Sequence, residues 1–153
     1  MIWLFNFAGR LAYQLSLPVI RAVISRTRRA YILLVSEDKV LVVKGWLGRQ
    51  KWQLPGGGVK KGEDDKLALI RELAEETGID VSASKLTLVA SGNWKTDRLA
   101  HRYKVYLTSL PALPKTKRLK PELIELAWLR PSKLDPSNAP AEILAALHTS
   151  GLV

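Results

Sequence analysis

The sequence contains no cysteine and only two histidines among its 153 residues. The absence of cysteine excludes a disulfide framework, thiol catalysis and the usual structural zinc sites. With so little histidine, a bound metal ion would be held mainly by oxygen atoms. Oxygen ligands favour magnesium, manganese or calcium over zinc or copper. Any metal site in this chain is therefore expected to be a cluster of carboxylates.

Acidic residues are also scarce, with 14 Asp and Glu against 24 Lys and Arg and a net charge of +10. The imbalance favours an anionic partner, such as a nucleotide, nucleic acid or a membrane surface. The cations gather in residues 1–36, which contain no acid, and in residues 115–120. A solvated basic surface is the alternative interpretation. The length suits one domain with a sizeable core.

No apolar run is long enough to cross a membrane. Residues 1–25 are mostly apolar, but Arg10, Gln14, Pro18 and Arg21 interrupt them, which argues against a secretory signal and a spanning helix. The polar positions of residues 1–28 form one stripe of an amphipathic helix. Such a helix is expected to dock on its own domain, to join a homodimer or to contact a membrane surface. The expected location is the cytoplasm, with a peripheral membrane position as the alternative.

Residues 29–153 have the pattern of a mixed α/β domain. Strands are predicted over residues 30–35, 40–43, 85–90, 101–107 and 123–129. Helices are predicted over residues 64–77 and 140–147. The connecting segments 45–51, 91–99 and 111–121 are predicted to be loops.

Residues 57–79 combine glycines with an acidic helix. Three glycines, at positions 56 to 58, predict a loop whose backbone can approach a ligand closely. On a helical projection, the core face is predicted to hold Leu67, Ile70, Leu73, Ala74 and Thr77. Glu72, Glu75 and Glu76 lie nearly opposite, where their mutual repulsion would become binding energy for a divalent cation. An acidic face exposed to solvent is the alternative.

The same stretch resembles the signature of the Nudix hydrolases. That signature is a glycine, five residues, a glutamate, seven residues and then R-E-U-x-E-E-x-G-U, where U is aliphatic. All nine defined positions are matched, by Gly57, Glu63, Arg71, Glu72, Leu73, Glu75, Glu76, Gly78 and Ile79. The likeness extends over residues 29–148 and leaves residues 1–28 outside the common fold.

The resemblance implies an α/β/α sandwich around a mixed β-sheet, with the N-terminal amphipathic segment added. It also implies hydrolysis of a nucleoside diphosphate linked to another group X, with Mg²⁺ or Mn²⁺ as cofactor. By the family pattern the metal ligands are Glu63, Glu72, Glu75, Glu76 and the Gly57 carbonyl. Arg71 would orient the glutamates. Independently of the resemblance, Arg71 and Glu75 are four residues apart on the predicted helix, so their side chains could pair.

The catalytic base is placed differently among family members. It lies either on the signature helix, here at Glu72 or Glu76, or on a glutamate further along the chain. Glu122 and Glu125 are the available residues of the second kind, and Glu122 stands where MutT-like members carry such a residue.

Several residues outside the signature are candidates for contacts with the substrate. Arg49, Lys51 and Lys60 could meet phosphates, and Asn138 resembles the asparagine-proline turn with which MutT-like members read a purine. Solvated lysines and an ordinary loop asparagine are the alternatives. Trp46, Trp52 and Trp94 could stack on a base, although tryptophan in such a sheet more often belongs to the core.

Three other functions share this fold. One is a module that binds nucleotide or RNA without hydrolysis, although binding alone would not need every glutamate. Another is an RNA 5′-end pyrophosphohydrolase, which the basic loops would suit. An activity like that of isopentenyl-diphosphate isomerase usually needs a catalytic cysteine, which this chain lacks.

Overall fold

The computed structural model describes residues 28–45, 51–95, 100–121 and 123–153. The predicted N-terminal helix, Trp46, Arg49 and Glu122 lie outside the described residues. The strands are β1 (Arg28–Ser36), β2 (Lys39–Gly45), β3 (Gly56–Val59), β4 (Thr87–Lys95), β5 (Ala100–Leu110) and β6 (Leu123–Leu129). The helices are α2 (Asp65–Thr77) and α3 (Ala141–Thr149), with short 3-10 turns at Ala83–Lys85 and Pro131–Lys133.

Within the described residues, the strands form one six-stranded sheet in the order β4-β5-β1-β2-β6, and β3 pairs with β1. The β1–β5 pair is parallel, whereas the other pairs are antiparallel. The mixed sheet is therefore as expected. No helix in the described ranges is long and apolar enough to cross a membrane.

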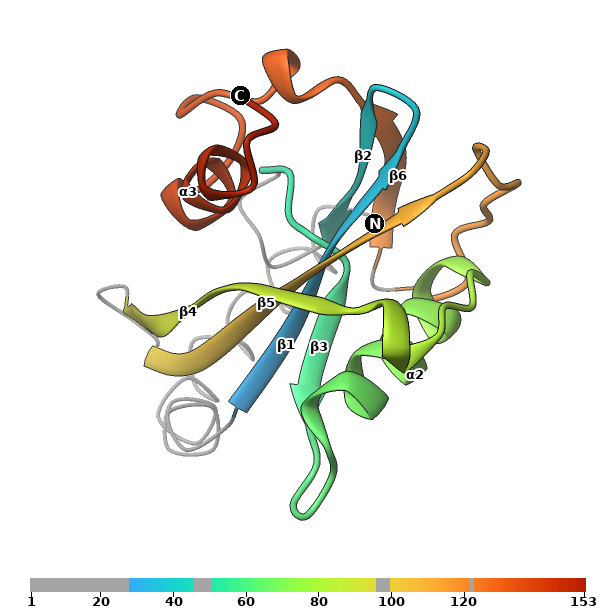
Figure 1. Ribbon diagram of the computed structural model, residues 1–153, viewed down its shortest axis with the longest axis vertical. Helices are drawn as coiled ribbons and strands as arrows, with labels where there is room; N and C mark the ends of the chain where they lie inside the picture. Colours follow the sequence, from blue (N-terminus) through green and yellow to red (C-terminus); the bar gives the residue numbers. More distant parts are fainter. Residues whose placement is uncertain (1–27, 46–50, 96–99, 122) are drawn as a thin grey trace, which may run out of the picture.

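Strand β1 lies at the centre because its residues are apolar on both faces. Ile32 and Leu34 belong to the core that packs on α2, and Leu33 belongs to the core that packs on α3. All three side chains are fully buried. Figure 1 shows α2 and α3 on opposite sides of the sheet. The predicted α/β/α sandwich is confirmed.

The glycine stretch after Pro55 is strand β3, so the expectation of a loop there was wrong. Gly56 lies opposite Tyr31 and Gly57 opposite Ala30 in an antiparallel pair with β1. A β-carbon on Gly56, whose φ is 137°, would lie 2.2 Å from the Ala30 carbonyl oxygen. The glycines therefore serve close strand pairing, which composition alone does not distinguish from a turn.

Helix α2 begins and ends as predicted. Of its predicted core face, Leu73 and Thr77 are buried and Ile70 packs on the core, but Leu67 was assigned wrongly. The Asp64 carboxylate caps the backbone N–H groups of Lys66 and Leu67, and Gly78 ends the helix with a φ of 73°. Leu67 is 57% exposed, whereas Ala68, Leu69 and Leu73 are fully buried. The core face is rotated toward the glutamates, and Glu76 is only 8% exposed. The acidic face is therefore partly enclosed instead of lying opposite the core.

Strand β4 is longer than predicted, and the loop expected from residue 91 is wrong for residues 91–95. Ser91, Gly92 and Asn93 pair with Lys104, Tyr103 and Arg102 of β5. The polar composition of residues 91–95 is typical of a loop. They form a strand because their backbone groups pair with β5. Residues 111–121 form neither helix nor strand, as predicted.

Candidate active site

Arg71 is the centre of a cluster of charged groups on α2 and the segment before it. Its guanidinium donates to both carboxylate oxygens of Glu63, at 3.0 and 3.1 Å, and to Glu72 at 2.8 Å. It also reaches Glu75 at 3.4 Å and the Gly58 carbonyl at 3.2 Å. The predicted contact between Arg71 and Glu75 is therefore present. One planar guanidinium holds three carboxylates in fixed relative positions.

Glu76 is buried where α2 meets β3. The backbone N–H of Gly56 donates to its Oε2 at 3.0 Å. Burial raises the pKa of Glu76 to about 7, against the hydrogen bond from Gly56 and the charge of Lys120. A carboxyl with this pKa exists in both protonation states near neutral pH. It can therefore accept or release a proton when the local charge changes.

Glu72 lies directly against the backbone of β3. A β-carbon on Gly57 would be 2.5 Å from the Glu72 Cδ and 2.7 Å from its Oε2. Glycine at position 57 therefore leaves the space that this carboxylate fills. The same contact brings the peptide group of Gly57 beside the carboxylate cluster.

Lys120 supplies a second cation to the cluster. Its ammonium lies 2.5 Å from Glu72 Oε2 and 3.0 Å from Glu75 Oε2. Burial alone would lower the pKa of Lys120, but its hydrogen bonds to the two glutamates outweigh this effect and raise the pKa. The contact with Lys120 is also the main reason why the pKa of Glu75 is lowered.

The segment that carries Lys120 is held against the C-terminal end of α2. The N–H of Lys117 donates to the Thr77 carbonyl at 3.3 Å, and the N–H of Leu119 donates to the Glu76 carbonyl at 3.0 Å. These bonds satisfy carbonyl groups that a helix end leaves unpaired. The sequence signals a basic loop here, but no spacing rule indicates that its lysine meets the glutamates.

The carboxylates have the oxygen atoms that a divalent cation binds, but in this structure they pair with Arg71 and Lys120. Among the described residues, no three His, Asp or Glu side chains stand ready to hold a metal ion. Arg71 and Lys120 engage the carboxylates instead. The oxygen donors suit Mg²⁺ or Mn²⁺, and the Lys120 ammonium shows that a cation fits between Glu72 and Glu75. These carboxylates therefore fit such a metal if the Lys120 ammonium moves away from Glu72 and Glu75.

Two predicted substrate contacts, Lys51 and Asn138, lie together near the start of α3. Lys51 donates to the Pro136 carbonyl at 2.8 Å. The Asn138 side chain donates to the Lys133 carbonyl and accepts from the Asp135 N–H, at 2.8 and 3.0 Å. The side-chain amide of Asn138 therefore stabilises the turn formed by residues 133–138.

The remaining predicted residues are spread more widely. Lys60 is exposed, and its backbone N–H donates to Glu63 at 2.8 Å. Glu125 pairs with Lys44 across β2 and β6 at 2.9 Å. Trp52 is 8% exposed and belongs to the core on the α3 side, which confirms the core interpretation for this tryptophan.

Comparison with known proteins identifies similar domains. A family model described as the NUDIX domain matches residues 25–147. A crystal structure of a MutT NUDIX hydrolase from Burkholderia pseudomallei superposes with a TM-score of 0.70 and 22% identity. That match covers 80% of this chain and 96% of the other. At this level of identity, the superposition establishes a shared fold.

Curated relatives are similar over shorter stretches. The mRNA-decapping enzyme subunit 2 of Arabidopsis thaliana is 47% identical over 53 residues, which are 35% of this chain and 14% of that protein. An RNA pyrophosphohydrolase of Psychrobacter sp. is 38% identical over 78 residues, which are 51% of this chain and 44% of the relative. The chain thus spans less than half the length of each of these relatives.

Proposed function

This chain belongs to the Nudix family, and on that premise we propose that it is a Mg²⁺- or Mn²⁺-dependent hydrolase of phosphoric anhydrides. The proposed substrate is a nucleoside diphosphate linked to another group, and the bond cleaved lies within the diphosphate. The observation that carries the proposal is the convergence of Glu63, Glu72 and Glu75 on Arg71, with Glu76 buried beside them.

The proposed ligands for the metal are Glu72, Glu75 and Glu76, with Glu63 and the Gly57 carbonyl as further oxygen donors. When bound, the metal would neutralise the diphosphate and lower the pKa of a coordinated water. Arg71 holds Glu63, Glu72 and Glu75 in position for that role. The close contact between Gly57 and Glu72 fixes the distance between strand and helix.

Glu76 is the best-supported candidate for general base among the described residues. Without metal, its burial and its pKa of about 7 suit a group that takes a proton from water at neutral pH. A Glu76 carboxylate bound to the metal would have a lower pKa, so the base and ligand roles of Glu76 are alternatives. Glu122 remains the alternative base that the family pattern offers, two positions after Lys120.

The test is a panel of nucleotides incubated with Mg²⁺ and either the wild-type protein or Glu76→Gln. We expect release of a nucleoside monophosphate or phosphate by the wild type and a rate at least about 100-fold lower for Glu76→Gln. Glu37→Gln is the matched control, because that glutamate is exposed in the turn between β1 and β2. A wild type inactive on every nucleotide would favour the binding module without hydrolysis. An active Glu76→Gln would refute the assignment of the site.

A second candidate substrate is the 5′ end of RNA. Its support is that relatives include proteins named as an mRNA-decapping subunit and as RNA pyrophosphohydrolases. The net charge of +10 also suits a polyanion. The experiment compares 5′-triphosphorylated RNA with a nucleoside triphosphate at equal concentration, and faster release of diphosphate from the RNA supports this substrate.

A further inference from the structure

The ammonium of Lys120 holds the carboxylate oxygens that a metal ion at Glu72 and Glu75 would need. Arg71 already contacts one oxygen of each glutamate, Oε1 of Glu72 at 2.8 Å and Oε1 of Glu75 at 3.4 Å. The other oxygen of each, Oε2, lies 2.5 and 3.0 Å from the Lys120 ammonium. A divalent cation and an ammonium repel each other at so short a range. Metal binding to these two glutamates must therefore displace the Lys120 ammonium.

The backbone on both sides of Lys120 is held by hydrogen bonds that the glutamate side chains do not make. The N–H of Leu119 donates to the Glu76 carbonyl at 3.0 Å, at the last turn of α2. The carbonyl of Lys120 accepts from the N–H of Leu123 at 3.2 Å, at the start of β6. Displacement of the ammonium therefore needs a change of the side chain only. The displaced ammonium stays within one side-chain length of the metal site.

The displaced ammonium would lack an anionic partner. The Lys120 side chain is only 27% exposed, so water reaches it poorly. A partly buried charge is unfavourable unless an opposite charge pairs with it. Its two present partners, Glu72 and Glu75, would be bound to the metal. Lys120 would therefore pair with the nearest anion that arrives at the site.

The anion that arrives with the metal is the diphosphate of the proposed substrate. A divalent ion held by carboxylates keeps coordination positions for phosphate oxygens. The carboxylates already neutralise much of the charge of the metal, so the diphosphate retains negative charge of its own. A lysine ammonium is a compact charge with three donors, which suits phosphate oxygens. The anchored Lys120 stands beside that position.

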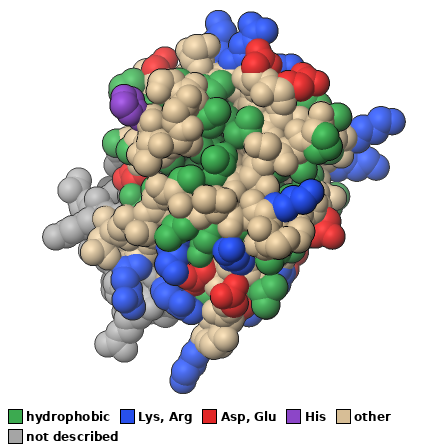
Figure 2. All heavy atoms as spheres, in the orientation of Figure 1, with side chains coloured by type: hydrophobic (Ala, Val, Ile, Leu, Met, Phe, Trp, Pro, Cys, Tyr) green, Lys and Arg blue, Asp and Glu red, His purple; other side chains and the backbone are tan. Residues whose placement is uncertain are grey.

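A general attraction of anions to the basic surface has to be separated from this contact. In Figure 2, Lys and Arg side chains lie around the Asp and Glu side chains at the lower end of the face shown. The net charge of +10 adds to the same effect. Such attraction depends on the summed charge of the protein. It would weaken to a similar extent whichever of two nearby lysines is removed.

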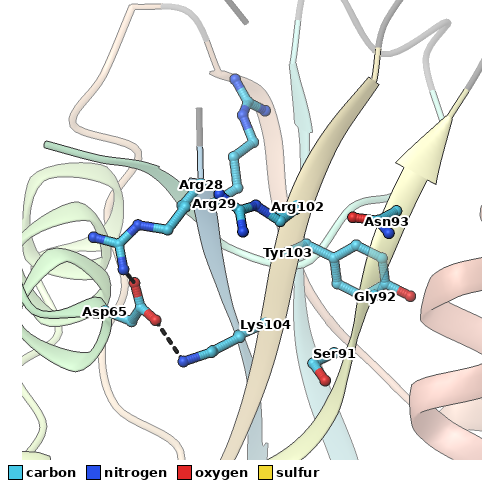
Figure 3. Close-up of a pocket in the computed structure, with 9 residues that line it drawn as sticks. All are labelled: Arg28, Arg29, Asp65, Ser91, Gly92, Asn93, Arg102, Tyr103 and Lys104. Carbon is cyan, nitrogen blue, oxygen red and sulfur yellow. Dashed lines mark ion pairs between the residues drawn. The ribbon is translucent and has the colours of Figure 1, made fainter. Parts of the chain in front are cut away.

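Helix α2 offers a second lysine–carboxylate pair for this comparison. Lys104 lies 2.7 Å from Asp65, and Arg28 lies 3.1 Å from the same carboxylate (Figure 3). Among the described residues that line this cavity, Asp65 alone is acidic. Lys104 thus holds one isolated carboxylate, whereas Lys120 holds two that meet at Arg71. Removal of Lys104 costs the same charge and a similar ion pair without touching the proposed metal ligands.

We propose that Lys120 is a phosphate-binding residue that the metal ion releases. Without metal, its ammonium holds Glu72 and Glu75 together. Once metal occupies these carboxylates, the ammonium turns to a phosphate oxygen of the substrate. Metal and diphosphate therefore bind in that order. This inference rests on the proposed function, because it needs a metal ion at the glutamates.

The first experiment titrates two ligands into wild type and Lys120→Met by calorimetry. One ligand is Mn²⁺ alone, and the other is methylenediphosphonate in excess Mg²⁺. The second probe is a diphosphate analogue whose P–C–P bridge is not hydrolysed. We expect Lys120→Met to bind Mn²⁺ more tightly, because no ammonium competes for the glutamates. The same variant should bind methylenediphosphonate about tenfold more weakly, because a charge-assisted contact is lost.

Lys104→Met is the matched control and should bind both ligands as the wild type does. Unchanged affinity of Lys120→Met for methylenediphosphonate would overturn the inference, as would equal weakening in both variants. Weaker binding of both ligands by Lys120→Met would also overturn it, because that result indicates a structural role. Thermal melts in Mg²⁺ exclude unfolding as the cause of lost binding.

The outcomes also separate this inference from the proposed function. Nucleotide hydrolysis by the wild type, with methylenediphosphonate binding that does not depend on Lys120, would overturn the inference alone. An inactive wild type whose Lys120→Met variant still shows the two opposite responses would count against hydrolysis alone. Failure of the wild type to bind Mn²⁺ would overturn the metal site and both proposals with it.

The second experiment follows the ammonium itself by NMR of the lysine side chains. The signal that is missing from Lys120→Met identifies Lys120. We expect this signal to shift when Mg²⁺ is added and to shift again when methylenediphosphonate follows. Lys120→Arg, which keeps a cation, should retain most of the affinity for methylenediphosphonate. A Lys120 signal that responds to Mg²⁺ but not to methylenediphosphonate would overturn the phosphate contact.

Discussion

Gly57 and Glu72 are in such close contact that a β-carbon on Gly57 would lie 2.5 Å from the carboxylate carbon of Glu72. The contact joins β3 to α2 at the point where the charged cluster begins. Arg71 and Lys120 hold the two oxygens of the same carboxylate from other sides. The Glu72 carboxylate is therefore held by the backbone of Gly57 on one side and by the cations of Arg71 and Lys120 on the others.

Gly57→Ala should displace Glu72, one of the proposed metal ligands, and lower the rate of anhydride hydrolysis at least about tenfold, since small misplacements at a reacting site are costly. The free energy of unfolding should fall by about 1–3 kcal/mol because of overpacking. Gly58→Ala is the matched control, because no atom lies within 4 Å of a β-carbon there. Steady-state kinetics and urea unfolding check both variants, and equal effects would contradict the role of the contact.

Arg71→Ala should separate the carboxylates that the guanidinium holds together. The hydrogen bonds from Arg71 are the main reason why the pKa of Glu63 is lowered to about 2, so this pKa should rise in the variant. The free energy of unfolding should fall by about 1–3 kcal/mol, as is typical for the loss of charged hydrogen bonds. An NMR titration of the glutamate carboxyls reports the first effect and urea unfolding the second. An unchanged pKa for Glu63 would show that Arg71 is not the reason why this pKa is low.

Lys120→Met should increase the apparent affinity for Mg²⁺ or Mn²⁺, because the metal no longer competes with an ammonium bound to Glu72 and Glu75. Without metal, the variant should melt at a lower temperature than the wild type, because the two carboxylates then repel each other. Calorimetric titration with Mn²⁺ and thermal melts with a chelator measure the two effects. Lys117→Met, at an exposed position in the same segment, serves as the control. Weaker metal binding by Lys120→Met would contradict the expectation.

His101 should contribute a loss of stability as the pH decreases from about 6.5 to about 4, opposed in the same range by Glu76, whose pKa is raised to about 7. Burial, with a smaller contribution from the charge of Arg29, lowers the pKa of His101 to about 4. The unfolded chain binds the proton near pH 6.5, before the folded protein does, so protonation favours unfolding in this window. The contribution is about 3 kcal/mol at most, estimated from the difference between these two pKa values.

The measurement is the free energy of unfolding at several pH values for wild type and His101→Gln. Between pH 4 and 6.5, the variant should lose the contribution of His101 and keep the opposite contribution of Glu76. The matched control is His148→Gln, because His148 is exposed on α3. Parallel curves for wild type and His101→Gln would disprove the assignment.

Local sequence predicted the parts of the fold that depend on local physics. The apolar run of β1 and the capping residues Asp64 and Gly78 set the central strand and the ends of α2. Fixed spacing within one helix was sufficient to place Arg71 near Glu75. These features need no knowledge of distant partners.

The parts that sequence reasoning missed depend on contacts between distant segments. Glycines form β3 because β1 lies within reach, and polar residues 91–95 form a strand because β5 pairs with them. Lys120 reaches Glu72 through the fold of the segment after β5, which no periodicity reveals. Leu67 was assigned to the core because the projection cannot decide how a helix is rotated against a sheet.

The parallel pair of β1 and β5 has a consequence for how the protein folds. Strand β5 follows β2, β3, α2 and β4 along the chain, so the centre of the sheet closes only after most of the domain has been synthesised. Contacts of such long sequence separation form slowly, because a large loop loses its freedom first. Until then one edge of the apolar strand β1 is open to pairing with other chains. Aggregation during synthesis should therefore depend on how soon residues 100–110 reach β1.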